Sequence, residues 1–156
     1  MLGKLLPSVV ISGALALLAL PACTATRSLV GWYSAETYEQ ADIALSRLMA
    51  KGEDMRHIGK LQATGPAASA RSQLDDLASI NAGRYCKDLA ALNDMPRKAV
   101  NLSFTKAVDS AKDGNMAALV KTHLRMLRTG VPPSSSDVIR DFDALRFSPP
   151  SHSPAR

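Results

Sequence analysis

The chain has 156 residues and carries 19 Lys and Arg against 14 Asp and Glu, a formal net charge of +5. Aromatic residues make up only 4% of the sequence, which argues against a β-sandwich. Without stacking aromatics interleaved among the basic residues, the positive charge does not indicate a nucleic-acid-binding protein.

Residues 1–22 have the pattern of a secretory signal peptide. Lys4 supplies the positive start, an apolar core runs from Val9 to Leu20, and small residues precede Cys23. The apolar core has about twelve residues, whereas a permanent membrane span needs about 20. We therefore expect the leader to be cleaved.

The end of this leader, Leu20-Pro21-Ala22-Cys23, resembles the lipobox of bacterial lipoprotein precursors. The resemblance implies that Cys23 is the lipidation site: its thiol receives a diacylglycerol, the leader is removed, and the new amine is acylated, typically with palmitate. Thr24 in place of aspartate implies an outer-membrane anchor facing the periplasm of a bacterial cell envelope. Two alternatives remain open, an ordinary cleaved signal and an uncleaved N-terminal anchor.

Removing residues 1–22 from the 156 leaves 134, enough for one domain. Alanine and leucine are abundant, and the apolar residues recur with a helical period. We predict an all-α fold, a small bundle of four to five amphipathic helices over 34–147. A lipidated tether over 23–33 precedes it, and a disordered, Ser- and Pro-rich tail follows over 148–156.

The first helix is predicted over 35–51, with Ser34 as its cap and Gly52 as its end. A short helical turn over 53–63 ends at Thr64-Gly65-Pro66. Residues 67–93 form either one long helix or two helices broken at Asn81-Ala82-Gly83.

The remaining predicted helices cover 96–112, 116–129 and 137–147. Asp113-Gly114-Asn115 is interpreted as the turn of an αα-hairpin, because the period on both sides is helical. Gly130 ends the helix over 116–129, and Ser136 caps the last one.

Basic residues are concentrated in the second half of the chain. Residues 84–130 hold nine Lys and Arg against four Asp and Glu, whereas residues 23–83 hold six against seven. The helical period places these side chains opposite the apolar faces, so we predict a partner-binding patch for an acidic protein or an anionic envelope component. A merely solvated helix face is the alternative. The patch comprises Lys98, Lys106, Lys121, Arg125 and Arg128.

His123 lies in the middle of an apolar helix face. It is either a core residue with its hydrogen bonds satisfied or the polar bottom of a pocket between helices. Cys86 is the one thiol that remains if Cys23 is lipidated, and burial is expected for it. The alternative is a nucleophile paired with His123 or His57, its pKa depressed by Arg84 and Lys87.

Glu53, Asp54 and His57 can share one helix face, which suits a divalent metal ion. Metal sites need three or four ligands at firm spacing, and nothing in the sequence supplies the rest. We therefore predict no metal, no cofactor and no catalytic residue.

These features favour a non-enzymatic envelope lipoprotein that binds another protein. In size, leader and helical content the chain is similar to the pilotins that escort secretin subunits, and to accessory lipoproteins of secretion and conjugation machinery. An inhibitor or immunity lipoprotein is one alternative. A small-ligand-binding periplasmic domain is another, and it requires His123 in an open pocket.

Overall fold

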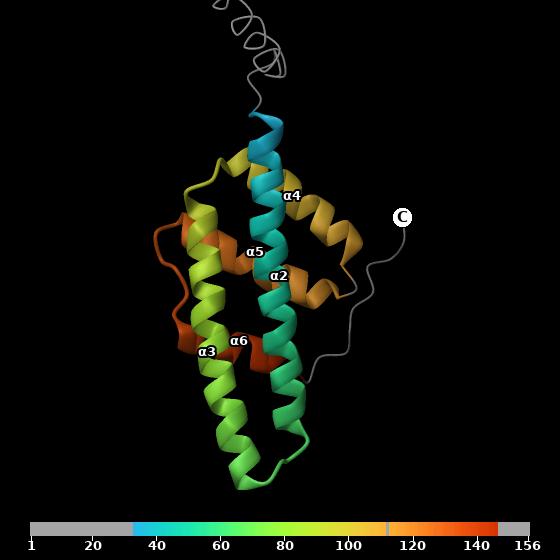
Figure 1. Cartoon of the computed structure of the whole chain (residues 1–156), viewed down its shortest axis with the longest axis vertical. Coiled ribbons are helices and arrows are strands. Elements are labelled where there is room, and N and C mark those ends of the chain that lie inside the picture. Colours follow the sequence, from blue (N-terminus) through green and yellow to red (C-terminus); the bar gives the residue numbers. More distant parts are fainter. Residues whose placement is uncertain (1–32, 112, 147–156) are drawn as a thin grey trace, which may run out of the picture. The chain divides into compact units, whose positions relative to one another are not determined.

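The structure is a computed structural model that describes residues 33–111 and 113–146, and this part of the chain forms helices without any strand (Figure 1). The chain divides into two units, residues 1–35 and 36–156, and the second holds the packed helices. The predicted all-α fold is confirmed for the described residues. The leader, Cys23 and the predicted tail lie outside them. The helices are α2 (Ala35–Ala63), α3 (Ala68–Asn93), α4 (Arg97–Ser110), α5 (Gly114–Arg128) and α6 (Ser135–Leu145).

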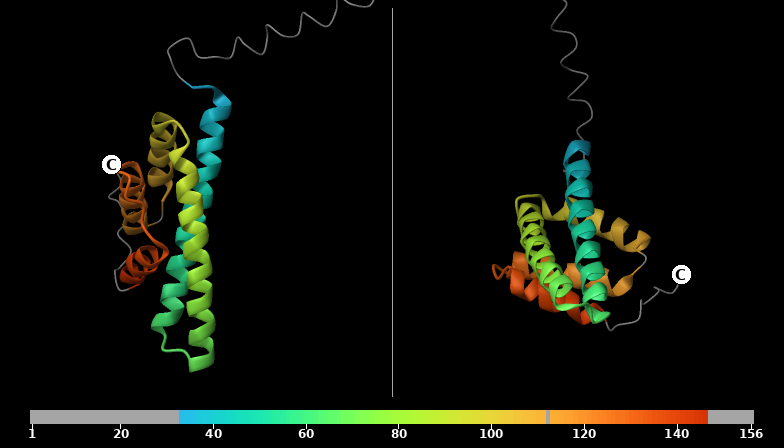
Figure 2. Two further views of the ribbon diagram at one scale, coloured as in Figure 1. Left: turned by 90° about the vertical axis from the view of Figure 1, so that its left-hand side faces the viewer. Right: turned by 60° about the horizontal axis from the view of Figure 1, so that its bottom comes forward.

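Helices α2 and α3 run antiparallel as a long hairpin, and α4, α5 and α6 pack against one of its faces (Figures 1 and 2). The turn between them contains Thr64-Gly65-Pro66, where a break in the helix was predicted. Gly65 adopts a φ of +68°, a left-handed conformation that favours glycine at a helix end. Beside the turn, the Gln62 amide donates to the Asp75 carboxylate at 2.8 Å, which joins the two helices.

The prediction that Gly52 ends the first helix is wrong, because α2 continues through it to Ala63 and absorbs the turn predicted over 53–63. Gly52 is buried, and a Cβ at this position would lie 3.2 Å from the Phe142 ring and 3.6 Å from the Met116 sulfur. The glycine therefore permits the close approach of α5 and α6 to α2. Its role is packing rather than termination.

Of the two alternatives for residues 67–93, the structure shows one continuous helix, α3. Gly83 lies on its exposed side, and a Cβ there would meet nothing within 4 Å. The glycine is thus tolerated without serving a contact, as long helices allow.

Helix α5 begins at Gly114 rather than at residue 116, and the cap of α6 differs from the prediction. Asp113 caps α5, since its carboxylate accepts from the backbone N–H of Asn115 at 2.9 Å and of Met116 at 3.3 Å. Ser134, not Ser136, caps α6: its hydroxyl accepts from the Asp137 N–H, and the Asp137 carboxylate accepts from the Ser134 N–H. This reciprocal capping box selects the serine that has an acidic residue three positions later.

The predicted end of α5 at Gly130 is confirmed. Gly130 has a φ of +80°, and its N–H donates to the Leu127 carbonyl at 3.2 Å. The Val131 N–H donates to the Met126 carbonyl at 3.1 Å, which completes a Schellman motif.

The core lies between the hairpin and the three shorter helices. Its aromatic centre is the edge-on pair Tyr85 and Phe142, whose ring centroids are 5.3 Å apart. One buried ion pair, between Arg56 of α2 and Asp113, joins α2 to the start of α5, and both side chains are 6% exposed. Around these groups the buried apolar residues form one cluster that includes Ala41, Leu45, Leu48, Met55, Ile58, Leu89, Leu92, Val100, Val120, Leu124 and Val138.

Gly52 and Gly83 give a pair of contrasting tests of this packing. Gly83→Ala should raise the free energy of unfolding by about 1 kcal/mol, because alanine favours the helix and its methyl meets nothing. Gly52→Val should lower it by about 1–3 kcal/mol, because the added carbons enter the space of Phe142. Urea unfolding followed by circular dichroism measures both. Equal effects at the two positions would contradict the packing role of Gly52.

Candidate partner-binding groove

A groove runs between α4 and α5, and its larger part has a volume of about 720 Å³. We call this part the basic half, because four of its lining residues are cationic and none is acidic. Phe104 and Leu124 supply apolar surface to it, and Asn101, Thr105 and Thr129 supply polar groups. The cations are Arg97 from α4 and Lys121, Arg125 and Arg128 from α5.

The charges of the basic half lie close enough to affect one another. The Arg128 guanidinium donates to the Asn101 side-chain oxygen at 2.8 Å, which holds it over α4. Partial burial lowers the pKa of Arg128, and the charge of Arg97 lowers it further. Guanidinium groups in such a cluster gain from a bound carboxylate, which neutralises their repulsion and accepts two hydrogen bonds at once.

The groove continues into a smaller depression of about 320 Å³, which we call the apolar half. Phe104, Thr105 and Lys121 line both parts, so the two halves adjoin. Val108, Ala117 and Ala118 make the surface of the smaller part largely hydrophobic, and Asp109 stands beside them. The whole groove therefore presents positive charge at one end and small apolar side chains at the other.

The structure divides the five basic residues of the predicted patch. Lys121, Arg125 and Arg128 come together in the basic half. Lys106 instead points toward α2, where its ammonium lies 3.6 Å from the Asp42 carboxylate. Lys98 is exposed on the first turn of α4 and does not line the basic half.

Arg97 belongs to the basic half but was missed by the sequence analysis. The apolar period of α4 marks which face is buried, but it does not say which of the exposed residues face α5. The signal that was present is the spacing of Arg97, Asn101 and Thr105, which places polar side chains along one stripe of the helix.

His123 is a fully buried core residue, and it lies in a hydrogen-bonded chain across three helices. Its Nδ1 lies 2.7 Å from the Tyr85 hydroxyl of α3, and its Nε2 lies 3.0 Å from the Asp141 carboxylate of α6. Because a carboxylate only accepts, Nε2 carries the hydrogen, and in the neutral ring Nδ1 accepts from Tyr85. Burial raises the pKa of Tyr85, so its hydroxyl stays protonated. This geometry is that of the core alternative, because the His123 side chain is fully buried and both of its ring nitrogens have partners.

Cys86 is half-buried on α3, and its thiol lies 3.6 Å from the Pro133 carbonyl oxygen, to which it donates. Burial raises the pKa of Cys86, and the charge of Asp137 raises it further, while a hydrogen bond with Ser135 opposes the shift. The lowering of this pKa by Arg84 and Lys87, which the nucleophile alternative requires, is not among the causes of the shift. A thiol with a raised pKa is a poor nucleophile.

His57 is exposed on α2, where Asp54 forms an ion pair with Lys51 at 3.5 Å. Within 33–111 and 113–146, no group of three or more His, Cys, Asp and Glu side chains is placed to hold a metal ion. Over the same residues, no helix combines the length and the apolar character needed to cross a membrane.

The raised pKa of Cys86 predicts slow alkylation. In Cys23→Ser protein, where Cys86 is the remaining thiol, the rate of reaction with iodoacetamide should rise with pH around a midpoint above that of N-acetylcysteine. In urea the midpoint should fall to the value of the free thiol, because the burial is lost. A midpoint below that of N-acetylcysteine in the folded protein would instead support the nucleophile.

With the geometry established, comparison of the chain with protein-family models, curated proteins and solved structures finds no match.

Proposed function

We propose that this protein is a lipid-anchored accessory protein of a bacterial envelope, and that its groove between α4 and α5 binds an acidic segment of a partner protein. The observation that carries the proposal is the basic half, where four cations line about 720 Å³ and no carboxylate does. Basic clusters of this kind recognise acidic or phosphorylated segments through charge-assisted hydrogen bonds.

The rest of the groove favours a peptide segment over a simple anion. Phe104 and Leu124 lie among the cations, and the adjoining apolar half offers Val108, Ala117 and Ala118. A segment that alternates acidic side chains with small apolar ones would contact both halves. Buried apolar area would then contribute to affinity, and the charges would contribute to specificity and to the association rate.

The proposed lipid anchor would locate this binding site at the membrane. With acyl chains on Cys23, the helical domain would be held near the bilayer, since two or more chains anchor stably. A partner bound in the groove would be carried to the same membrane. This is the behaviour expected of an accessory module that escorts or positions a component of a secretion or conjugation machine.

The anchor is tested by metabolic labelling with radioactive palmitate in a bacterial host. The native chain should incorporate the label, and Cys23→Ser should not, because the thiol that receives the lipid is gone. The variant should also keep its leader and migrate as the longer precursor. Equal labelling of the two proteins, or a native chain that begins at Met1, would contradict the lipoprotein assignment.

The groove is tested by reversing its charge. Lys121→Glu/Arg125→Glu should weaken binding of a short fluorescent peptide of glutamate, alanine and leucine by about tenfold or more, because attraction becomes repulsion at two positions. Binding to the native protein should also weaken as salt is added. Fluorescence anisotropy measures both effects.

The matched control is Arg84→Glu/Lys87→Glu, which makes the same change in charge on exposed residues of α3 outside the groove. It should bind the peptide about as well as the native protein does.

A photo-crosslinker at Thr105, which lines both halves, should attach to an acidic segment of the partner in cells. If Lys121→Glu/Arg125→Glu and Arg84→Glu/Lys87→Glu lost peptide binding equally, the result would contradict a binding site in the groove.

A further inference from the structure

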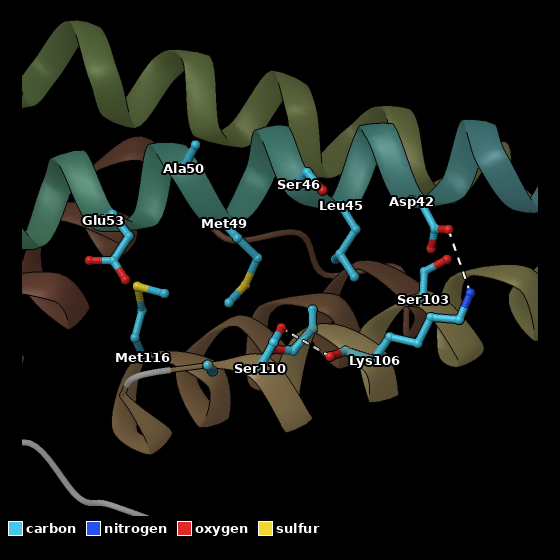
Figure 3. Close-up of a pocket in the computed structure, with 12 residues that line it drawn as sticks. Asp42, Leu45, Ser46, Met49, Ala50, Glu53, Ser103, Lys106, Ser110 and Met116 are labelled. Atoms are coloured by element: carbon cyan, nitrogen blue, oxygen red, sulfur yellow. Dashed lines mark hydrogen bonds and ion pairs between the residues drawn. The ribbon is translucent and has the colours of Figure 1, made fainter.

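A second cleft, of about 490 Å³, lies between α2 and α4 (Figure 3). It shares no lining residue with the groove between α4 and α5, because a different face of α4 borders it. Its volume falls in the range of small-molecule sites. The basic groove and this cleft are therefore independent candidates for binding.

Ser103 of α4 is the unusual residue in this cleft. Only 3% of its surface is exposed, and its hydroxyl oxygen has no hydrogen-bond partner among the described residues. Buried hydroxyl groups in native proteins nearly always have a partner, so the Ser103 hydroxyl has hydrogen-bonding capacity that the described residues do not use. It stands at the end of the cleft that the Asp42–Lys106 ion pair borders (Figure 3).

The remaining lining indicates the character of the ligand. Met49 points into the middle of the cleft, and Met116 lies beside Glu53 at the end away from Ser103 (Figure 3). Methionine adapts its shape to apolar groups of many forms. Asp42 and Glu53 outnumber Lys106 among the charged lining residues, and Lys106 already lies 3.6 Å from Asp42. An anionic ligand would meet net negative charge here.

We propose that the cleft between α2 and α4 binds a small, uncharged amphipathic molecule. Its apolar chain lies over Met49 and Met116, and its hydroxyl or carbonyl group forms a hydrogen bond with the Ser103 hydroxyl. This site is separate from the groove for an acidic segment, so either one can fail without the other.

The test uses 1-octanol as the probe and octanoate as its anionic counterpart, with the protein carrying ¹³C in its methionine methyl groups. On titration with 1-octanol, the NMR signals of Met49 and Met116 should shift. Those of Met95 and Met126, which do not line the cleft, should stay. Octanoate should bind more weakly. Shifts spread over all four methyl groups, or tighter binding of octanoate, would overturn the proposal.

Two variants make the result specific. Ser103→Ala should weaken 1-octanol binding roughly five- to tenfold, the effect of one hydrogen bond, and should leave the melting temperature unchanged or raised. A lowered melting temperature would show that the hydroxyl serves the fold, which is incompatible with the site. Ala107→Leu fills the cleft from α4 and should abolish the shifts of the Met49 and Met116 signals. Unaltered 1-octanol binding by either variant would likewise refute the proposal.

Discussion

The hydrogen-bonded chain through His123 is the interaction on which the rest of this structure depends. It links α3, α5 and α6 through Tyr85 and Asp141, at 2.7 Å and 3.0 Å. A buried imidazole must keep both nitrogens paired, so α5 cannot rotate or slide without leaving a polar atom unsatisfied. With the inner face of α5 held in this way, its outer face must present Lys121 and Arg125 toward α4. The position of the basic groove thus follows from a contact in the core.

The fold follows from local pattern to a large extent. The helical period predicted each helix within residues 33–111 and 113–146. Gly65 and Gly130 end helices as expected, because both adopt positive φ. Gly52 shows the limit, because its role depends on Phe142, a residue far along the chain that no local pattern connects to it. Gly83 is also a glycine inside a long helix, yet a Cβ added there would meet nothing within 4 Å. The start of α6 was within reach of the sequence, since Asp137 lies three residues after Ser134 and completes its capping box.

The candidate sites were also predictable only in part, because the sequence pattern gives the neighbours on one helix but not the contacts between helices. The period of α5 identifies Lys121, Arg125 and Arg128 as neighbours, and the groove contains all three. The sequence does not say how α4 crosses its neighbours, and that crossing sends Lys106 toward α2 and Arg97 toward α5. The special position of Ser103 could not be predicted for the same reason. A serine on a helix becomes a candidate binding residue only once its burial and its hydrogen-bond partners are known. Secondary structure and charge along one helix could be anticipated, whereas relations between helices required the structure.

The hydrogen bond between Arg128 and Asn101 has a consequence for how fast and how tightly the groove can capture a segment. A long flexible cation usually loses rotamer freedom when it closes on a carboxylate, and that conformational entropy opposes association. At 2.8 Å from Asn101, the Arg128 guanidinium is already oriented across the groove before anything binds. It is therefore preorganised to receive the first acidic side chain to arrive, and the more exposed Lys121 and Arg125 can close on the segment afterwards.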